Sequence, residues 1–176
     1  MHHYLFLFLA VFTLIACSDG AADTDTDADP QGATTIYFTR HAEKGSGDDP
    51  NLTAAGQERA ERLASLLSGK KVAAVYATDR RRTQQTAAPL AKARGLQVRT
   101  YDIGGDAAAL TDGWVKQHRG QTILVVGHSN TVPDLLNALT GKREYGDIPG
   151  GEFSRLYKVM VNGRGRVKVR EMSSGK

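Results

Sequence analysis

The chain has 176 residues, with 23 basic and 19 acidic side chains, which is enough for one domain with a substantial core. Its single cysteine excludes an internal disulfide framework. Five of the 19 acids lie in residues 18–33, which leaves 14 acids against all 23 bases and a net charge of +9 for the rest. Such a field favours anionic substrates and acidic lipid headgroups. No aromatic-rich or basic recognition element indicates nucleic acid as a partner.

The N-terminus carries an apolar run at residues 4–15, which is too short to cross a bilayer as a helix. It ends in Leu14-Ile15-Ala16-Cys17 and resembles a bacterial lipoprotein signal, although His2 and His3 stand where Lys or Arg is usual. The resemblance implies a signal peptide at 1–16, a lipid anchor on Cys17 and a location in the bacterial cell envelope. The alternative is a packed N-terminal helix with a buried cysteine.

Residues 17–33 alternate aspartate with alanine, threonine and glycine and offer nothing apolar to bury. This composition predicts a disordered acidic tether. A flexible chain of this length reaches roughly 20–25 Å. The folded domain is therefore expected at residues 34–176.

Four short apolar runs within that domain predict strands at 34–38, 72–77, 96–101 and 122–126. Helical spacing of apolar residues predicts helices after them, at 52–67, 81–94, 106–118 and 131–139. Thr53 is the expected N-cap of the first helix. Pro89 argues for a kink or an early break in the second helix, and the last helix is expected to begin near Pro133.

Strands that alternate with helices predict a mostly parallel sheet covered on both faces, a three-layer α/β/α sandwich. Residues 153–161 and 166–172 alternate in polarity and flank an Asn-Gly-Arg-Gly turn. This pattern predicts a C-terminal β-hairpin at the edge of the sheet.

Reactive side chains follow each of the four parallel strands. They are Arg40-His41 after the first, Thr78 and Arg80-Arg81-Arg82 after the second, Asp102 and Asp106 after the third, and Gly127-His128-Ser129 after the fourth. Because the carboxyl ends of parallel strands share one edge, and ligands of open α/β sheets bind there, these side chains are expected to form one site.

The chemistry of this set points to phosphate. Arginine matches phosphate oxygens two at a time, and a helix start near Thr131 would add backbone donors. Gly127 would let the backbone pass close to a bound group. A neutral histidine can attack phosphorus and hold the phosphoryl group covalently.

Three motifs in order, Thr-Arg-His-Ala-Glu-Lys, Thr78-x-x-x-Arg82-Thr83-x-x-Thr86-Ala87 and Val-Gly-His-Ser-Asn-Thr, resemble the histidine phosphatase superfamily, whose fold is called phosphoglycerate mutase-like. The resemblance covers residues 34–172. It implies that His41 is the phosphorylated nucleophile and that Arg40, Arg82 and His128 complete the phosphate pocket. Thr78 takes the place of a common supporting serine, and Ser129 is placed among the substrate-binding residues. Arg80 and Arg81 are then expected on the helix surface.

The proton donor is where this chain departs from the family pattern. Mutases of the family carry a glutamate after the third strand, and this chain has none there. Asp102, Asp106 and Glu43 are the candidate acids. The alternatives are turn or helix-cap roles for the two aspartates and an ion pair for Glu43. The missing glutamate, the exported location and the lack of a long cap insertion argue against a glycolytic mutase.

These features predict a metal-independent histidine-type acid phosphatase that hydrolyses small phosphomonoesters without a cofactor. A metal ion on His41 and His128 is disfavoured by the fixed charge of Arg40. Alternatives are a catalytically silent anion-binding lipoprotein, a phosphohistidine phosphatase or a mutase. His118 is expected to be solvent-exposed, and Trp114 is expected in the core.

Overall fold

The computed structural model describes residue 1, residues 32–102 and residues 104–175. The expected signal peptide, the lipidation site Cys17 and nearly all of the expected tether lie outside the described residues. Ala33, the last residue of that tether, is buried at 3% exposure, so the packed domain already includes it.

Ten elements follow one another: β1 (Thr34–Arg40), α1 (Ala54–Leu66), β2 (Val72–Ala77), α2 (Arg81–Ala93), β3 (Val98–Thr100), α3 (Ala107–Gln117), β4 (Thr122–Gly127), α4 (Thr131–Thr140), β5 (Arg155–Val161) and β6 (Val167–Ser173). The strand order is β3-β2-β4-β1-β5-β6. The first four strands are parallel, and β5 and β6 pair antiparallel at one end as the predicted edge hairpin. No helix of the described part is long and apolar enough to cross a bilayer.

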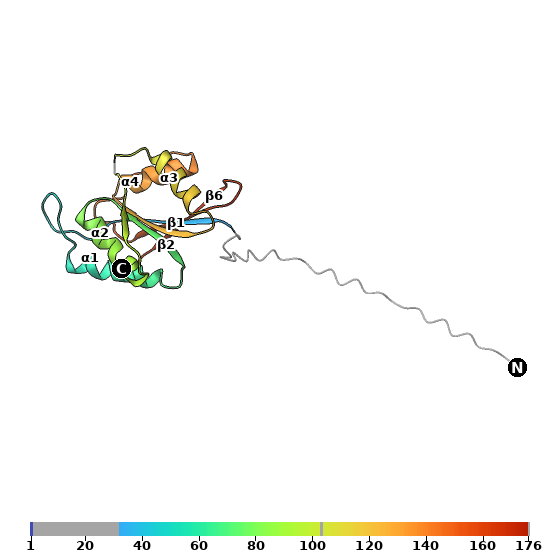
Figure 1. The fold of residues 1–176 in the computed structure, drawn as a ribbon, viewed down its shortest axis with the longest axis horizontal. Coiled ribbons are helices and arrows are strands. Elements are labelled where there is room, and N and C mark those ends of the chain that lie inside the picture. Colours follow the sequence, from blue (N-terminus) through green and yellow to red (C-terminus); the bar gives the residue numbers. More distant parts are fainter. Residues whose placement is uncertain (2–31, 103, 176) are drawn as a thin grey trace.

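Helices cover both faces of this sheet, which confirms the three-layer sandwich (Figure 1). One apolar cluster joins the sheet to α3 and α4 and contains Trp114, which packs against the rings of Phe38, Tyr76 and Tyr101. A second cluster joins the opposite face to α1 and α2. All seven residues of β1 are buried, so the strand that leads to His41 runs through the centre of the core.

Two elements differ from expectation. α2 continues through Pro89. Proline has no backbone N–H and so removes one helical hydrogen bond. The buried residues Ala87 and Leu90, on either side of Pro89, pack this part of α2 against the core and offset that loss. The third strand is three residues long, because the Leu96 N–H caps α2 at the Ala91 carbonyl (2.8 Å).

His118 is not solvent-exposed, contrary to expectation. It is buried at 4% exposure, with Nε2 2.9 Å from the Tyr76 hydroxyl and Nδ1 3.0 Å from Gln121 Oε1. Both ring nitrogens therefore have partners, so the imidazole can enter the core without losing hydrogen bonds.

The loop after His41 is locked to the start of α1, whose N-cap is Thr53 as expected. The Thr53 N–H donates to the Glu43 carbonyl (3.0 Å), and the Thr53 hydroxyl accepts from the Gly56 N–H (3.2 Å). A Cβ on Gly56 would lie 2.1 Å from the Glu43 carbonyl oxygen, so only glycine allows this approach.

Gly56→Ala is therefore expected to destabilise the protein by about 2–3 kcal/mol, because backbone atoms must move to make room. The measurement is the free energy of unfolding from urea titration. Gly113→Ala is the matched control, since Gly113 also lies within a helix and a Cβ there meets nothing within 4 Å. That control should gain roughly 0.5–1 kcal/mol. Equal stabilities of the two variants would contradict the argument.

Candidate active site

The two histidines meet because their strands are neighbours in the sheet. Arg40 pairs with Gly127 in the register of β1 and β4, and the His41 N–H donates to the Gly127 carbonyl (2.9 Å). The two imidazoles then lie edge to face, with ring centroids 5.5 Å apart. The two histidines that follow β1 and β4 in the sequence therefore lie together at one edge of the sheet, as expected.

His41 is held as a neutral base with a defined tautomer. Its Nδ1 lies 2.8 Å from the Ala42 carbonyl, which can only accept, so Nδ1 carries the proton and Nε2 keeps its lone pair. The residue is 3% exposed. Burial, opposed in part by the Ala42 hydrogen bond and reinforced by the charges of Arg40, Arg82 and Lys44, lowers the pKa of His41 to about 4. An unprotonated Nε2 at neutral pH is what nucleophilic attack requires.

A chain of hydroxyl groups orients His128. The Thr83 hydroxyl donates to the Arg80 carbonyl (2.7 Å) and so accepts from Thr78 Oγ1 (2.8 Å). Thr78 Oγ1 in turn accepts from His128 Nε2 (2.9 Å). His128 Nδ1 then faces Arg82 Nη2 at 3.4 Å as an acceptor. Thr78 contacts the second histidine directly, in keeping with the supporting role that the family resemblance implies.

Arg82 is the arginine of its cluster that enters the site. Its side chain is 16% exposed, whereas that of Arg81 is 67% exposed, and the expected surface position of Arg81 is confirmed. Asp49, from the loop before α1, lies 3.6 Å from Arg82 Nη1 and accepts from the Arg81 N–H (2.9 Å). The acid thus holds the start of α2 and the arginine in place together.

Arg40 has a partly structural role that the sequence did not indicate. Its Nη1 donates to three carbonyls of the loop before β5, those of Pro149 (2.8 Å), Gly150 (3.0 Å) and Glu152 (3.1 Å). Its guanidinium also lies 4.4 Å from the Phe153 ring centroid, and that ring packs against His41. Arg40 therefore fastens this loop beside the nucleophile.

The site has a net positive charge, because the two arginines Arg40 and Arg82 face only one nearby carboxylate, that of Asp49, among the described residues. Burial and the charge of Arg82 lower the pKa of Arg40. The Nε atoms of Arg40 and Arg82 are buried, and neither has a hydrogen-bond partner among the described residues. Buried N–H groups are rarely left without an acceptor. The charges of Arg40 and Arg82 beside two neutral histidines nevertheless suit the binding of an oxyanion.

None of the three candidate acids contacts the histidines. The Asp106 carboxylate caps α3 by accepting from the Ala108 N–H (2.9 Å), and exposed Asp102 accepts from the Gly104 N–H (3.0 Å). These are the turn and cap roles weighed as alternatives. Asp102 also lines an open cavity of about 450 Å³ with Asp79 and Arg80.

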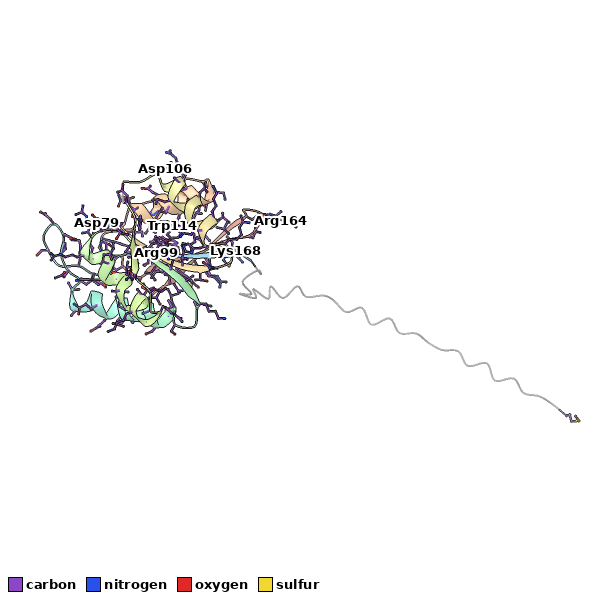
Figure 2. The ribbon with its side chains drawn as sticks, viewed as in Figure 1. Asp79, Arg99, Asp106, Trp114, Arg164 and Lys168 are labelled. Carbon is purple, nitrogen blue, oxygen red and sulfur yellow. The ribbon has the colours of Figure 1, made fainter. Side chains whose placement is uncertain are left out.

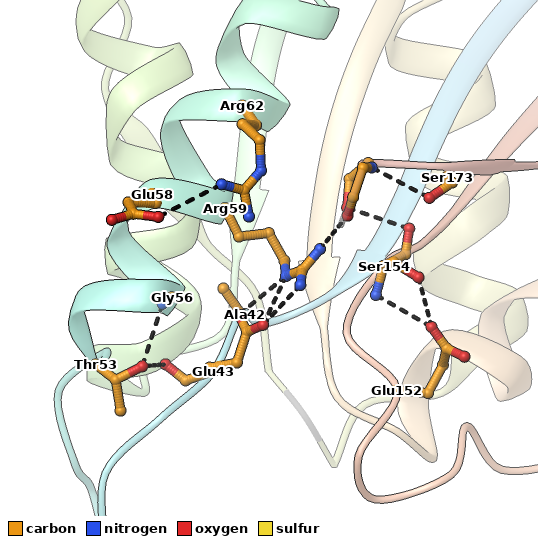
Figure 3. Close-up of polar contacts among 12 residues, drawn as sticks. Ala42, Glu43, Thr53, Gly56, Glu58, Arg59, Arg62, Glu152, Ser154 and Ser173 are labelled. Atoms are coloured by element: carbon orange, nitrogen blue, oxygen red, sulfur yellow. Dashed lines mark hydrogen bonds and ion pairs between the residues drawn. The ribbon is translucent and has the colours of Figure 1, made fainter.

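Glu43 forms the ion pair that was its alternative role. Both carboxylate oxygens accept from Arg59, at 2.7–3.0 Å (Figure 3). The hydrogen bond from Arg59 is the main reason that the pKa of Glu43 is lowered. A carboxyl group stabilised in its ionised form is a poor proton donor. Arg59 Nη1 also donates to the Gly175 carbonyl, which ties the C-terminus to this loop.

Three further features expected to bind phosphate are Gly127, the start of α4 and Ser129, and the structure shows other contacts for each of them. Gly127 is required by packing, because a Cβ there would lie 2.8 Å from Thr131 Oγ1 and 2.9 Å from the Tyr101 hydroxyl. The first turn of α4 offers few free donors, since the Val132 N–H donates to the His128 carbonyl and Pro133 has none. Ser129 is half-buried, and its carbonyl accepts from the Ile148 N–H (2.8 Å).

Sequence reasoning missed Asp49 and Phe153, and it assigned no role to Thr83 and Thr86, although both lie in the second motif. Thr86 accepts from the Ala42 N–H (2.9 Å) and donates to the Arg82 carbonyl (2.7 Å), so it joins the first two motifs. The Thr-x-x-Thr spacing within the second motif places both hydroxyls on one face of α2, which is the signal for a shared role. Asp49 and Phe153 come from loops and carried no such signal.

The pKa of His128 is also lowered to about 4, by burial first and then by the charge of Arg82. Both imidazoles should therefore titrate near pH 4 in NMR spectra of the folded protein, well below the ordinary value of about 6.5. The unfolded chain binds these protons at higher pH, so stability should fall as the pH drops from about 6.5 to 4. Titration of both rings near 6.5 would contradict the burial argument.

Among the described residues, no group of three His, Cys, Asp or Glu side chains is arranged to hold a metal ion.

Residues 36–103, which contain the first two motifs, match the family described as histidine phosphatase superfamily (branch 1). Comparison with curated proteins gave no match.

Solved structures match over nearly the whole domain. The protein histidine phosphatase SixA, complexed with tungstate, has a TM-score of 0.63 at 19% identity over 80% of this chain and 97% of its own. A phosphoserine phosphatase from Entamoeba histolytica has a TM-score of 0.64 at 17% identity, over 80% of this chain and 98% of its own. A structure described as a phosphohistidine phosphatase SixA from Nakamurella multipartitia has a TM-score of 0.62 at 26% identity, over 82% of this chain and 98% of its own.

The fold of this chain matches that of these solved phosphatase structures. Within this fold, the elements of this chain deliver its two histidines, Arg40 and Arg82 to one end of the sheet. The three motifs of this chain thus come together from segments that are far apart in the sequence.

Proposed function

We propose that this chain is a metal-independent phosphatase that hydrolyses small phosphomonoesters through a phosphohistidine on His41. The observation that carries the proposal is the buried, neutral His41, whose Nδ1 bonds the Ala42 carbonyl and whose ring lies beside the charges of Arg40 and Arg82. The family match over residues 36–103 and the similarity to solved phosphatases that act on different substrates support the same class of reaction.

The reaction has two displacement steps. Nε2 of His41 attacks phosphorus and the bond to the leaving oxygen breaks, while Arg40 and Arg82 stabilise the charge on the equatorial oxygens and His128 accepts from Arg82. The leaving oxygen takes up a proton from solvent water, because none of the three candidate acids contacts the histidines. Water then attacks the phosphohistidine, which releases inorganic phosphate and restores the Nε2 lone pair. The Ala42 carbonyl keeps the ring oriented throughout by its bond to Nδ1–H.

The test is turnover of a generic aryl phosphate by the purified protein, with and without EDTA. We expect equal rates in both, and a phosphoryl group on His41 after rapid alkaline quenching. Tight stoichiometric binding of vanadate without turnover of any substrate would instead support the catalytically silent anion-binding protein.

The positions of two of the candidate acids, Glu43 and Asp106, favour a second candidate substrate, one with a phosphorus–nitrogen bond. Glu43 is paired with Arg59 and Asp106 caps α3, so neither is placed to protonate an alcohol. The imidazole of a phosphohistidine leaves without such an acid when its other nitrogen is protonated, and two SixA structures share the fold. A higher kcat/KM for phosphoimidazole than for an alkyl phosphate would support this substrate, and the reverse order would exclude it.

We also propose that the protein acts in the bacterial cell envelope, anchored through a lipid on Cys17. The apolar run before this cysteine supports the proposal. Cys17→Ser should abolish incorporation of labelled fatty acid in cells. Unchanged labelling in this variant would overturn it.

A further inference from the structure

The amino-terminal edge of the sheet, opposite the histidines, is formed by three loops. By strand register, Thr34 of β1 lies beside Val161 of β5, while Thr122 of β4 lies beside both Thr35 and Val72. The loops before β2 and β4 and the turn after β5 therefore meet at one edge. This edge and the histidines lie at opposite ends of strands six or seven residues long, roughly 20 Å apart.

Five bases project from these loops, and we call them the basic edge: Lys70, Lys71, Arg119, Arg164 and Arg166. All five are exposed, and in the described part of the chain none of them pairs with a carboxylate. The loops themselves, 67–71, 118–121 and 162–166, contain no acidic residue. Glu144, which lies near the hairpin turn, is paired with Lys142 (3.9 Å).

The chain enters the domain at this same edge. A Cβ on Gly120 would lie 3.7 Å from Gly32, so the first described residues of the domain run beside the loop that carries Arg119. Figure 2 shows Arg164 and Lys168 at the end of the molecule where the chain enters β1. The apolar run at residues 4–15 thus connects, through about 17 residues, to the basic edge and not to the catalytic end.

We propose that the basic edge docks on a membrane surface of anionic lipid headgroups, with the catalytic end facing away from the lipid. Three loops from different parts of the sheet present bases that have no neighbouring acids among the described residues, which suits a surface of many phosphates better than one deep anion site. The proposal is independent of the proposed phosphatase activity. Docking would also keep the positive catalytic end clear of competing headgroups.

The test uses lysine footprinting of the full-length chain with lipid vesicles. The chain is bound to phosphatidylcholine vesicles with or without about 30% phosphatidylglycerol, then treated with acetic anhydride and analysed by mass spectrometry. Lys44 is the internal control, because it is exposed and follows His41 at the opposite end. We expect labelling of Lys70 and Lys71 to slow at least about threefold in anionic vesicles and to recover at about 0.5 M NaCl, while Lys44 is unchanged.

The triple variant Arg119→Gln, Arg164→Gln, Arg166→Gln should lose this protection, and Arg81→Gln, which removes a base at the catalytic end, should keep it. Equal labelling of Lys70 and Lys71 in both vesicle types, or failure of the chain to float with anionic vesicles, would overturn the proposal. Protection that persists without vesicles would also overturn it, because another part of the chain would then cover the edge.

Discussion

His41→Ala should lower the rate of aryl phosphate hydrolysis at least about 10⁴-fold, to the limit of detection. The imidazole supplies the attacking lone pair, and no other described side chain combines a free ring nitrogen with the same burial and arginine neighbours. His128 cannot replace it, because Thr78 and Arg82 contact its two ring nitrogens. The measurement is kcat/KM at neutral pH, together with the loss of the quenched phosphohistidine.

His118→Gln is the matched control for this variant. His118 is a second buried histidine, but its partners are Tyr76 and Gln121 in the core between α3 and the sheet. Glutamine can keep one of these hydrogen bonds, so activity should stay within about twofold once stability is matched. Residual activity of His41→Ala above a hundredth of the parent rate would reject the covalent route.

Arg82→Gln should reduce kcat/KM by about 10²–10³-fold, because it removes a cation that acts on the developing charge of the transferring phosphoryl group. Arg82 also supplies the buried Nε–H that lacks an acceptor and contacts His128 Nδ1 at 3.4 Å. Arg82→Lys should recover only part of the loss, since an ammonium keeps the charge but not the planar fork.

The adjacent arginine tests whether position or charge matters. Arg81→Gln removes the same charge one residue earlier in α2, from a side chain that is 67% exposed. Solvent screens that charge, so kcat/KM should change by less than about threefold. Similar losses from both variants would show that the site uses only a general positive field. In that case the specific role of Arg82 would be wrong.

Much of this protein could be read from its sequence. Buried β-branched runs and the spacing of apolar residues predicted the sandwich and the edge hairpin, because the periods of strands and helices are local properties. The Arg40-His41 and Gly127-His128 motifs predicted one shared site, since parallel strands end at a common edge. Deviations came where capping or packing overrode local preference, as at Leu96 and Pro89.

Only the tertiary structure decided what each polar side chain contacts. Glu43 meets Arg59 across 16 positions of sequence, and Arg40 meets the carbonyls of residues 149–152 across more than a hundred. Such partners depend on how α1 and the loop before β5 pack, which no local pattern encodes. The sequence by itself therefore determined the fold and the meeting of Arg40, His41, Arg82 and His128 at one end of the sheet. Packing alone decided that His41 is buried and neutral, and that the candidate acids turn away from it.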